Sequence, residues 1–135
     1  MSIDFAHNAR PTVGVEMELH LVDANSGDLV SIANEVLDEL GAAHPNGEHP
    51  KAKHELFQST LEVITGVCDT PDQLRDDLQT TIAEVRSSLG SRNATLMSSA
   101  THPYALAANQ LISPDPRYHE LVETMQWPAR RLLIC

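Results

Sequence analysis

The stretch TVGVEMELHLV, residues 12–22, decides the fold of this chain. Apolar and polar side chains alternate along it, which is the period of a strand that buries one face. The apolar positions are Val13, Val15, Met17, Leu19 and Leu21. We therefore predict a half-buried strand over residues 12–22, whose opposite face carries Gly14, Glu16, Glu18 and His20.

The polar face of this strand would hold Glu16 and Glu18 with their Cα atoms roughly 6.5–7 Å apart. Carboxylates at that spacing can bind one hard cation or two neighbouring ones. A solvated face explains the same pattern equally well, so the strand alone leaves both interpretations open. His20 follows on this face; it could support a cation site, but a surface position is the expected one.

The composition is that of an ordinary globular domain. The chain has 135 residues, 41% of them hydrophobic and 21% charged, which suffices for one domain with a core. Its formal net charge of −10 argues against nucleic acid and anionic membranes as partners. The start of the sequence lacks a signal-peptide pattern, and two cysteines make no disulfide framework, so we expect a cytoplasmic location.

Helical and strand patterns follow one another along the rest of the chain. We predict a returning strand at 29–31, a helix at 32–40, an extended segment at 54–67, a strand at 94–99, a helix at 117–126 and a strand at 130–135. A helix of about 20 residues begins after Thr70, a candidate N-cap with Pro71 and Gln73 behind it. The pattern predicts an α+β fold, with helices packed on a mainly antiparallel sheet.

A second acidic element surrounds the apolar segment LEVITGV, residues 61–67. Glu62 lies within it, and a carboxylate there needs either a partner or an exposed edge. Glu55 comes seven residues earlier and would point to the opposite face of an unbroken strand. A bulge or bend near residues 58–60 is required to bring both glutamates to one side.

Several motifs, taken in order, resemble the N-terminal third of bacterial carboxylate–amine ligases of the glutamate–cysteine ligase type 2 family. They are PTVGVEME at 11–18, Glu55, LEVITGVC at 61–68, ATHP at 100–103, Arg117-Tyr118 and the end at 130–135. The two-glutamate motif alone is a weak signal. The ordered set covers nearly the whole chain and is a strong one.

The resemblance implies a glutamine-synthetase-like catalytic fold, whose antiparallel sheet holds Mg²⁺ and ATP on its concave face. It implies an ATP-dependent ligase that joins the γ-carboxylate of glutamate to cysteine through an acyl phosphate. The family's metal-binding acids correspond to Glu16, Glu18, Glu55 and Glu62. His102 and Arg131 are weaker candidates for substrate contacts: His102 could simply stabilise a turn, and Arg131 could pair with a carboxylate.

Members of this family are more than twice as long as the present chain. We therefore expect residues 1–135 to form one domain that is the N-terminal part of a longer catalytic domain. The expected partners are ATP and amino acids, with a homodimer if a sheet edge is exposed. The alternative is a non-catalytic acidic module that binds a metal or nucleotide and is completed by a partner chain.

We predict that the 135-residue chain alone does not catalyse ligation, because the resemblance assigns an active-site histidine to the segment that follows residue 135. The measurement is release of ADP in the presence of ATP, glutamate and cysteine. Release that requires all three compounds would contradict this prediction.

Overall fold

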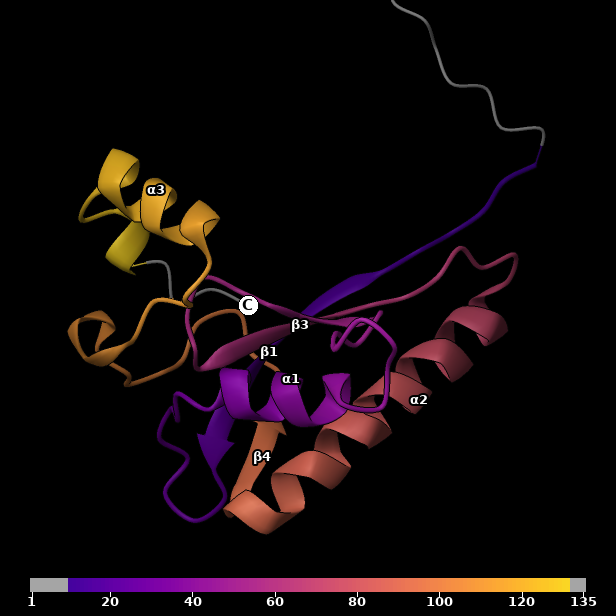
Figure 1. Cartoon of the computed structure of the whole chain (residues 1–135), viewed down its shortest axis with the longest axis horizontal. Coiled ribbons are helices and arrows are strands. Elements are labelled where there is room, and N and C mark those ends of the chain that lie inside the picture. The colour runs from indigo at the N-terminus through magenta and orange to yellow at the C-terminus, as the bar shows by residue number, and fades with distance from the viewer. Residues whose placement is uncertain (1–9, 132–135) are drawn as a thin grey trace, which may run out of the picture.

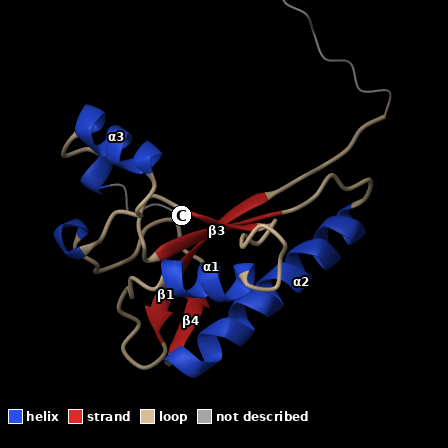
Figure 2. Cartoon of the chain, in the orientation of Figure 1, coloured by secondary structure: helices blue, strands red, loops and turns tan. Residues whose placement is uncertain are grey.

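A four-stranded antiparallel sheet forms the centre of the computed structural model, which describes residues 10–131 (Figures 1 and 2). Its strands are β1 (Glu16–Asp23), β2 (Ala52–His54), β3 (Thr60–Ile64) and β4 (Ala94–Met97). The spatial order is β2-β3-β1-β4. The helices are α1 (Ala33–Gly41), α2 (Pro71–Leu89) and α3 (Pro116–Met125), with short 3₁₀ turns η1 (Gly90–Arg92), η2 (Ala107–Asn109) and η3 (Ala129–Arg131). The α+β prediction is confirmed.

Strand β1 runs through the interior of the sheet and pairs on both sides. Against β3 it sets Leu19 opposite Leu61, and against β4 it sets Leu21 opposite Leu96. The predicted strand over 12–22 is therefore present, although its continuous ladder starts only at Glu16. Isolated bridges extend the pairing at the two ends, from Val13 to Cys68 and from Val22 to Leu29.

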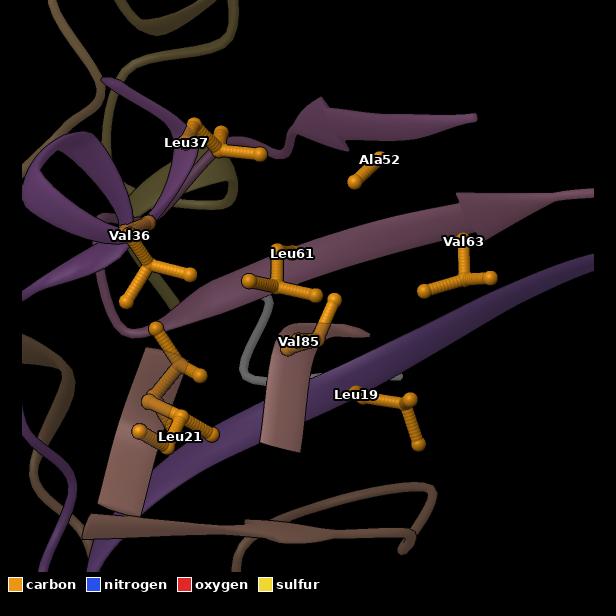
Figure 3. Close-up of a cluster of buried hydrophobic side chains, with 10 residues drawn as sticks. Leu19, Leu21, Val36, Leu37, Ala52, Leu61, Val63 and Val85 are labelled. Atoms are coloured by element: carbon orange, nitrogen blue, oxygen red, sulfur yellow. The ribbon is translucent and has the colours of Figure 1, made fainter. Parts of the chain in front are cut away.

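Helices α1 and α2 cover one face of the sheet. The main hydrophobic core lies between this face and the two helices (Figure 3). The core side chains come from the sheet and from both helices. They include Leu19, Leu21, Leu61, Val63, Val36, Leu37, Val85 and Leu89. Burial of each such side chain stabilises the fold by roughly 1.5–3 kcal/mol. The apolar side of β1 therefore faces the core, as its two-residue period predicts.

Helix α2 begins as its sequence predicts. The hydroxyl of Thr70 accepts from the backbone N–H of Gln73 at 3.2 Å, and Pro71 occupies the first turn, where no N–H donor is needed. The Gln73 side chain, in turn, accepts from the N–H of Asp69 at 2.8 Å. The helical path continues through Gly90 into η1 and ends at Asn93, whose φ of 51° is left-handed.

The predicted extended segment at 54–67 is confirmed for residues 60–64, which form β3, and is wrong before them, because the chain reverses there. Strands β2 and β3 are antiparallel neighbours, with Lys53 opposite Glu62. Residues 55–59 make the reversal, in which the N–H of Thr60 donates to the carbonyl of Phe57 at 3.0 Å. The bend expected near 58–60 is present, but as a turn between two strands and not as a bulge within one.

A second, smaller hydrophobic cluster explains this reversal. Leu56 and Phe57 pack there against Tyr118 and Val122 of α3, and α3 lies apart from α1 and α2 in Figure 1. The predicted helix at 117–126 is confirmed, since α3 spans Pro116–Met125. The predicted strand at 130–135 is wrong for its first two residues, which lie in η3, and residues 132–135 lie outside the described part of the chain.

We predict that Gly41→Ala destabilises the domain. A Cβ atom at this buried position would lie 2.1 Å from the carbonyl oxygen of Gly47, so the loop at 42–50 would have to move. Overpacking of this kind costs about 1–3 kcal/mol. Thermal unfolding measures the effect as a lower melting temperature.

Gly90→Ala is the matched control. Gly90 has helical angles, and a Cβ atom there would meet nothing within 4 Å. Alanine favours the helical backbone more than glycine does, so the melting temperature of the Gly90→Ala variant should be unchanged or slightly higher. Equal losses of stability in the two variants would contradict the steric explanation.

Candidate functional site

The face of the sheet opposite the main core carries the predicted acidic residues. Glu18 on β1 lies directly opposite Glu62 on β3, and Glu16 precedes Glu18 by two residues on the same side. Directly opposed side chains on neighbouring strands have Cβ atoms about 4.5–5.5 Å apart. Lys53 on β2 lies opposite Glu62, so one row across three strands reads Lys53, Glu62, Glu18.

Glu55 reaches this region from the connection between β2 and β3. Its carboxylate Oε1 accepts from the N–H of Leu56 at 2.8 Å. Its carbonyl oxygen accepts from the hydroxyl of Ser113. The reversal of the chain therefore removes the parity problem that an unbroken strand would create, because Glu55 and Glu62 no longer belong to the same strand.

The charges of these carboxylates act on Glu18 and Glu62. Partial burial, and then the charges of Glu55, Glu62 and Glu16, raise the pKa of Glu18. Partial burial, and then the charges of Glu16 and Glu55, raise the pKa of Glu62, while Arg117 acts in the opposite direction. The acidic face, as we call Glu16, Glu18, Glu55 and Glu62, is thus one electrostatic unit.

The acidic face is not a complete cage for a metal ion. Within residues 10–131, no three His, Cys, Asp or Glu side chains converge closely enough to hold one. The donor chemistry nevertheless fits Mg²⁺, which binds oxygen and usually takes one or two carboxylates together with water and substrate phosphates. The assignment of the four glutamates as metal ligands stays a prediction.

His20 is buried, which overturns the surface position expected for it. Only 1% of the residue is exposed. Its Nδ1 lies 3.4 Å from the hydroxyl of Thr60, and its Nε2 contacts no hydrogen-bonding partner among the residues that the structure describes. Burial, and secondarily the nearby His102 ring at 5.9 Å between ring centres, lower the pKa of His20. The imidazole therefore extends the polar row of β1 as a neutral group.

His102 stabilises a turn, the role that the sequence left open beside a substrate contact. Its Nε2 donates to the carbonyl of Gly27 at 2.9 Å, and its Nδ1 accepts from the N–H of Ala105 at 3.1 Å. Because a carbonyl only accepts, these bonds assign the hydrogen to Nε2. Both ring nitrogens thus have protein partners, and a substrate contact by His102 stays a prediction.

Arg131 lies on the surface at η3. Its guanidinium carbon is 5.4 Å from the centre of the Trp127 ring. No carboxylate of the described residues lies within ion-pair distance of it, so the structure does not show the expected pairing with a protein carboxylate there. Its substrate contact also stays a prediction.

Two clefts border the acidic face, and sequence reasoning predicted neither. The first has a volume of about 620 Å³ at the β2 edge of the sheet, and its lining includes Lys53, His54, Glu62 and Arg117. The second has a volume of about 550 Å³ beside α3 and is lined by Glu55, Arg117, Tyr118, Glu120, Leu121 and Thr124. The pair Arg117-Tyr118 was a motif of the resemblance, but its position between two clefts depends on the tertiary structure.

Comparison with known proteins decides the family. The profile described as Glutamate-cysteine ligase family 2 matches residues 12–135. This chain belongs to that family.

None of the helices in the part described, residues 10–131, is long and apolar enough to cross a membrane.

Curated relatives align with almost all of the sequence of this chain. It is 43% identical over 133 residues to "Putative glutamate--cysteine ligase 2" of Thermobifida fusca, covering 98% of this chain and 33% of the relative. It is 47% identical over 134 residues to "Putative glutamate--cysteine ligase 2-1" of Frankia alni, covering 99% of this chain and 35% of the relative. The chain thus spans about a third of the length of the curated relatives it matches.

We predict that Glu16→Gln raises the melting temperature of the metal-free chain at neutral pH. Glu16 contributes to the raised pKa of both Glu18 and Glu62, so its removal relieves repulsion in the folded state. A carboxyl whose pKa is raised on folding contributes stability that is complete below its unfolded pKa, here 4.5, and is lost as the pH rises through the folded pKa. The gain from Glu16→Gln should therefore be small near pH 4 and larger at pH 7.

Melting curves recorded across this pH range measure the effect. Glu123→Gln is the control, because this exposed glutamate on α3 contributes to neither pKa shift. A gain that is equal for the two variants, or that does not grow with pH, would contradict the electrostatic coupling.

Proposed function

We propose that this chain supplies the acidic half of the active site of an ATP-dependent carboxylate–amine ligase of the glutamate–cysteine ligase type. One observation carries the proposal: in a chain of this family, the fold gathers four glutamates from positions 16–62 beside one sheet face. The names of the curated relatives support it. The substrates would be ATP and two amino acids, glutamate and cysteine in the first instance, and the reaction would take place in the cytoplasm.

In this proposal, carboxylates of Glu16, Glu18, Glu55 and Glu62 would hold Mg²⁺ together with water and substrate phosphates, which would complete its coordination. A magnesium ion there would neutralise charge on the triphosphate and on the oxygens that develop charge during phosphoryl transfer. The raised pKa values of Glu18 and Glu62 support this role, because a cation would remove the repulsion that contributes to them. The glutamates then act as fixed negative charges and not as proton donors or acceptors.

The reaction proposed has two displacements. First, a carboxylate oxygen of the acid substrate attacks the γ-phosphorus of ATP, the bond to the bridging oxygen breaks, and ADP leaves. An acyl phosphate results. The amine nitrogen of the second substrate then attacks the acyl carbon, phosphate leaves, and the amine loses a proton to water. The glutamine-synthetase-like arrangement of the whole catalytic domain is part of the same proposal.

We predict that millimolar MgCl₂ raises the melting temperature of the 135-residue chain. A ligand that binds only the folded state stabilises it by RT ln(1 + [L]/Kd), about 1.4 kcal/mol at ten times Kd. NaCl at matched ionic strength should give a smaller shift, because it screens the carboxylates without bridging them. The double variant Glu18→Gln/Glu62→Gln should lose the difference between the two salts.

A shift that is the same in both salts, or that survives the double substitution, would remove the metal from the proposal. The ligase itself is tested in a chain of the relatives' length, by profiling ADP release across pairs of amino acids. Absence of any such activity in that longer protein would overturn the proposed function.

A further inference from the structure

Arg117 lies where the two clefts meet. Among the residues that the structure describes, it is the one side chain that lines both of them. On one side it shares a cleft with Glu62 and Lys53, and on the other it shares a cleft with Glu55. A group bound at Arg117 would therefore have carboxylates of the acidic face on both sides.

The guanidinium of Arg117 is held in place although the residue is exposed. Its central carbon lies 4.4 Å from the centre of the Tyr118 ring, and its Nη2 donates to the Tyr118 hydroxyl. That hydroxyl in turn donates to the carbonyl of His54 at 2.9 Å. Tyr118 is itself buried, with 4% exposure, so the support beneath the guanidinium is rigid.

The backbone of Arg117 is fixed as well. Asp115 is the N-cap of α3, and its carboxylate accepts from the Arg117 N–H at 2.8 Å. The side chain therefore leaves the first turn of the helix at a defined place. A preorganised arginine loses less rotamer entropy when it binds a ligand, which favours its use in recognition.

The charge of Arg117 is not consumed by an ion pair. No carboxylate in residues 10–131 lies within 4.0 Å of its guanidinium nitrogens, although Glu55 and Asp115 are close enough to raise its pKa, after the larger effect of Tyr118. Arg10, Arg75 and Arg92 do form ion pairs. A guanidinium has five N–H donors, and the Tyr118 hydroxyl occupies one side of it, so donors remain for a ligand.

We propose that Arg117 binds an oxyanion group of a substrate, either a phosphoryl or a carboxylate group, next to the acidic face. This inference rests on the proposed function. The chain has a net charge of −10, so an anion can approach four glutamates only if positive charge accompanies it. Arg117 supplies a fixed positive charge, and its planar guanidinium can donate to two oxygens of a phosphoryl or carboxylate group.

Lys53 is the second cation of this site. It lines the first cleft with Arg117, and its ammonium group lies 3.9 Å from Glu48, at the limit of an ion pair. It projects from the row that contains Glu62 and Glu18. Arg117 therefore positions the anion and Lys53 adds attraction, while neither residue transfers a proton.

The test is titration of the 135-residue chain with two probes at a fixed millimolar MgCl₂ concentration. Sodium tripolyphosphate represents the phosphoryl source, and sodium glutamate represents the carboxylate source. Binding is followed by calorimetry and by the arginine Nε–H resonances in NMR spectra. The variants are Arg117→Gln and Arg117→Lys, with Arg75→Gln as the control of equal charge change on α2, outside both clefts.

We expect Arg117→Gln to raise the Kd of at least one probe about tenfold, as loss of a charge-assisted hydrogen bond does. Arg117→Lys should restore part of the affinity, and Arg75→Gln should leave the Kd unchanged. The probe that responds identifies the source of the oxyanion. Should Arg117→Gln fail to fold, Arg117→Lys carries the test, because it keeps the charge but loses the fork and should still weaken binding.

Two outcomes would overturn the inference: equal Kd values in the parent chain and in Arg117→Gln for both probes, whether or not the melting temperature falls, or no saturable binding of either probe to the parent chain. The proposed function is judged separately. Its metal site stands if the magnesium-specific rise in melting temperature is retained in Arg117→Gln and depends on Glu18 and Glu62, and its ligase activity stands on ADP release in the longer protein, even when the anion site is rejected.

Discussion

The pairing register between β1 and β3 is the constraint on which the rest of the structure depends. The same register sets Leu19 opposite Leu61 and Glu18 opposite Glu62. Because side chains alternate along a strand, a slip of one residue would turn the leucines to solvent and the glutamates into the core. Burial of each core side chain is worth roughly 1.5–3 kcal/mol and many such side chains are buried, whereas the directly opposed glutamates are a single unfavourable pair. The hydrophobic core therefore holds the carboxylates together against their repulsion.

Local patterns predicted most of the fold. The two-residue period of β1, the capping residues of α2 and the first turn of α3 are all visible within short windows of sequence. The reversal at residues 55–59 is not, because Leu56 and Phe57 resemble strand residues and their partners in α3 lie about 60 residues away along the chain. The burial of His20 is hidden for the same reason, since His102 and Thr60 cover it from distant segments.

The residues of the candidate site also divide into those that local sequence predicted and those that depend on the tertiary structure. Glu16 and Glu18 stand out from the residues alone, because a single strand presents both. Glu55 was a weaker candidate from the residues alone, and only the family resemblance assigned it to the metal site, because its position depends on a turn that its neighbouring residues do not predict. Arg117 belonged to a recognisable motif, yet its significance lies in a tyrosine ring, a backbone carbonyl and two clefts that are assembled only in three dimensions.

The acidic face is assembled from two separately packed parts. Glu16, Glu18 and Glu62 belong to the sheet above the main core, whereas Glu55 is joined to Leu56 in the cluster that α3 builds. The distance between Glu55 and the other three carboxylates therefore depends on how the two parts of the domain pack together, and not on the conformation of any one loop. A substitution at Val122, an apolar residue of α3 that is far from the four glutamates in the sequence, would change the geometry of this polar site by changing how the two hydrophobic clusters pack.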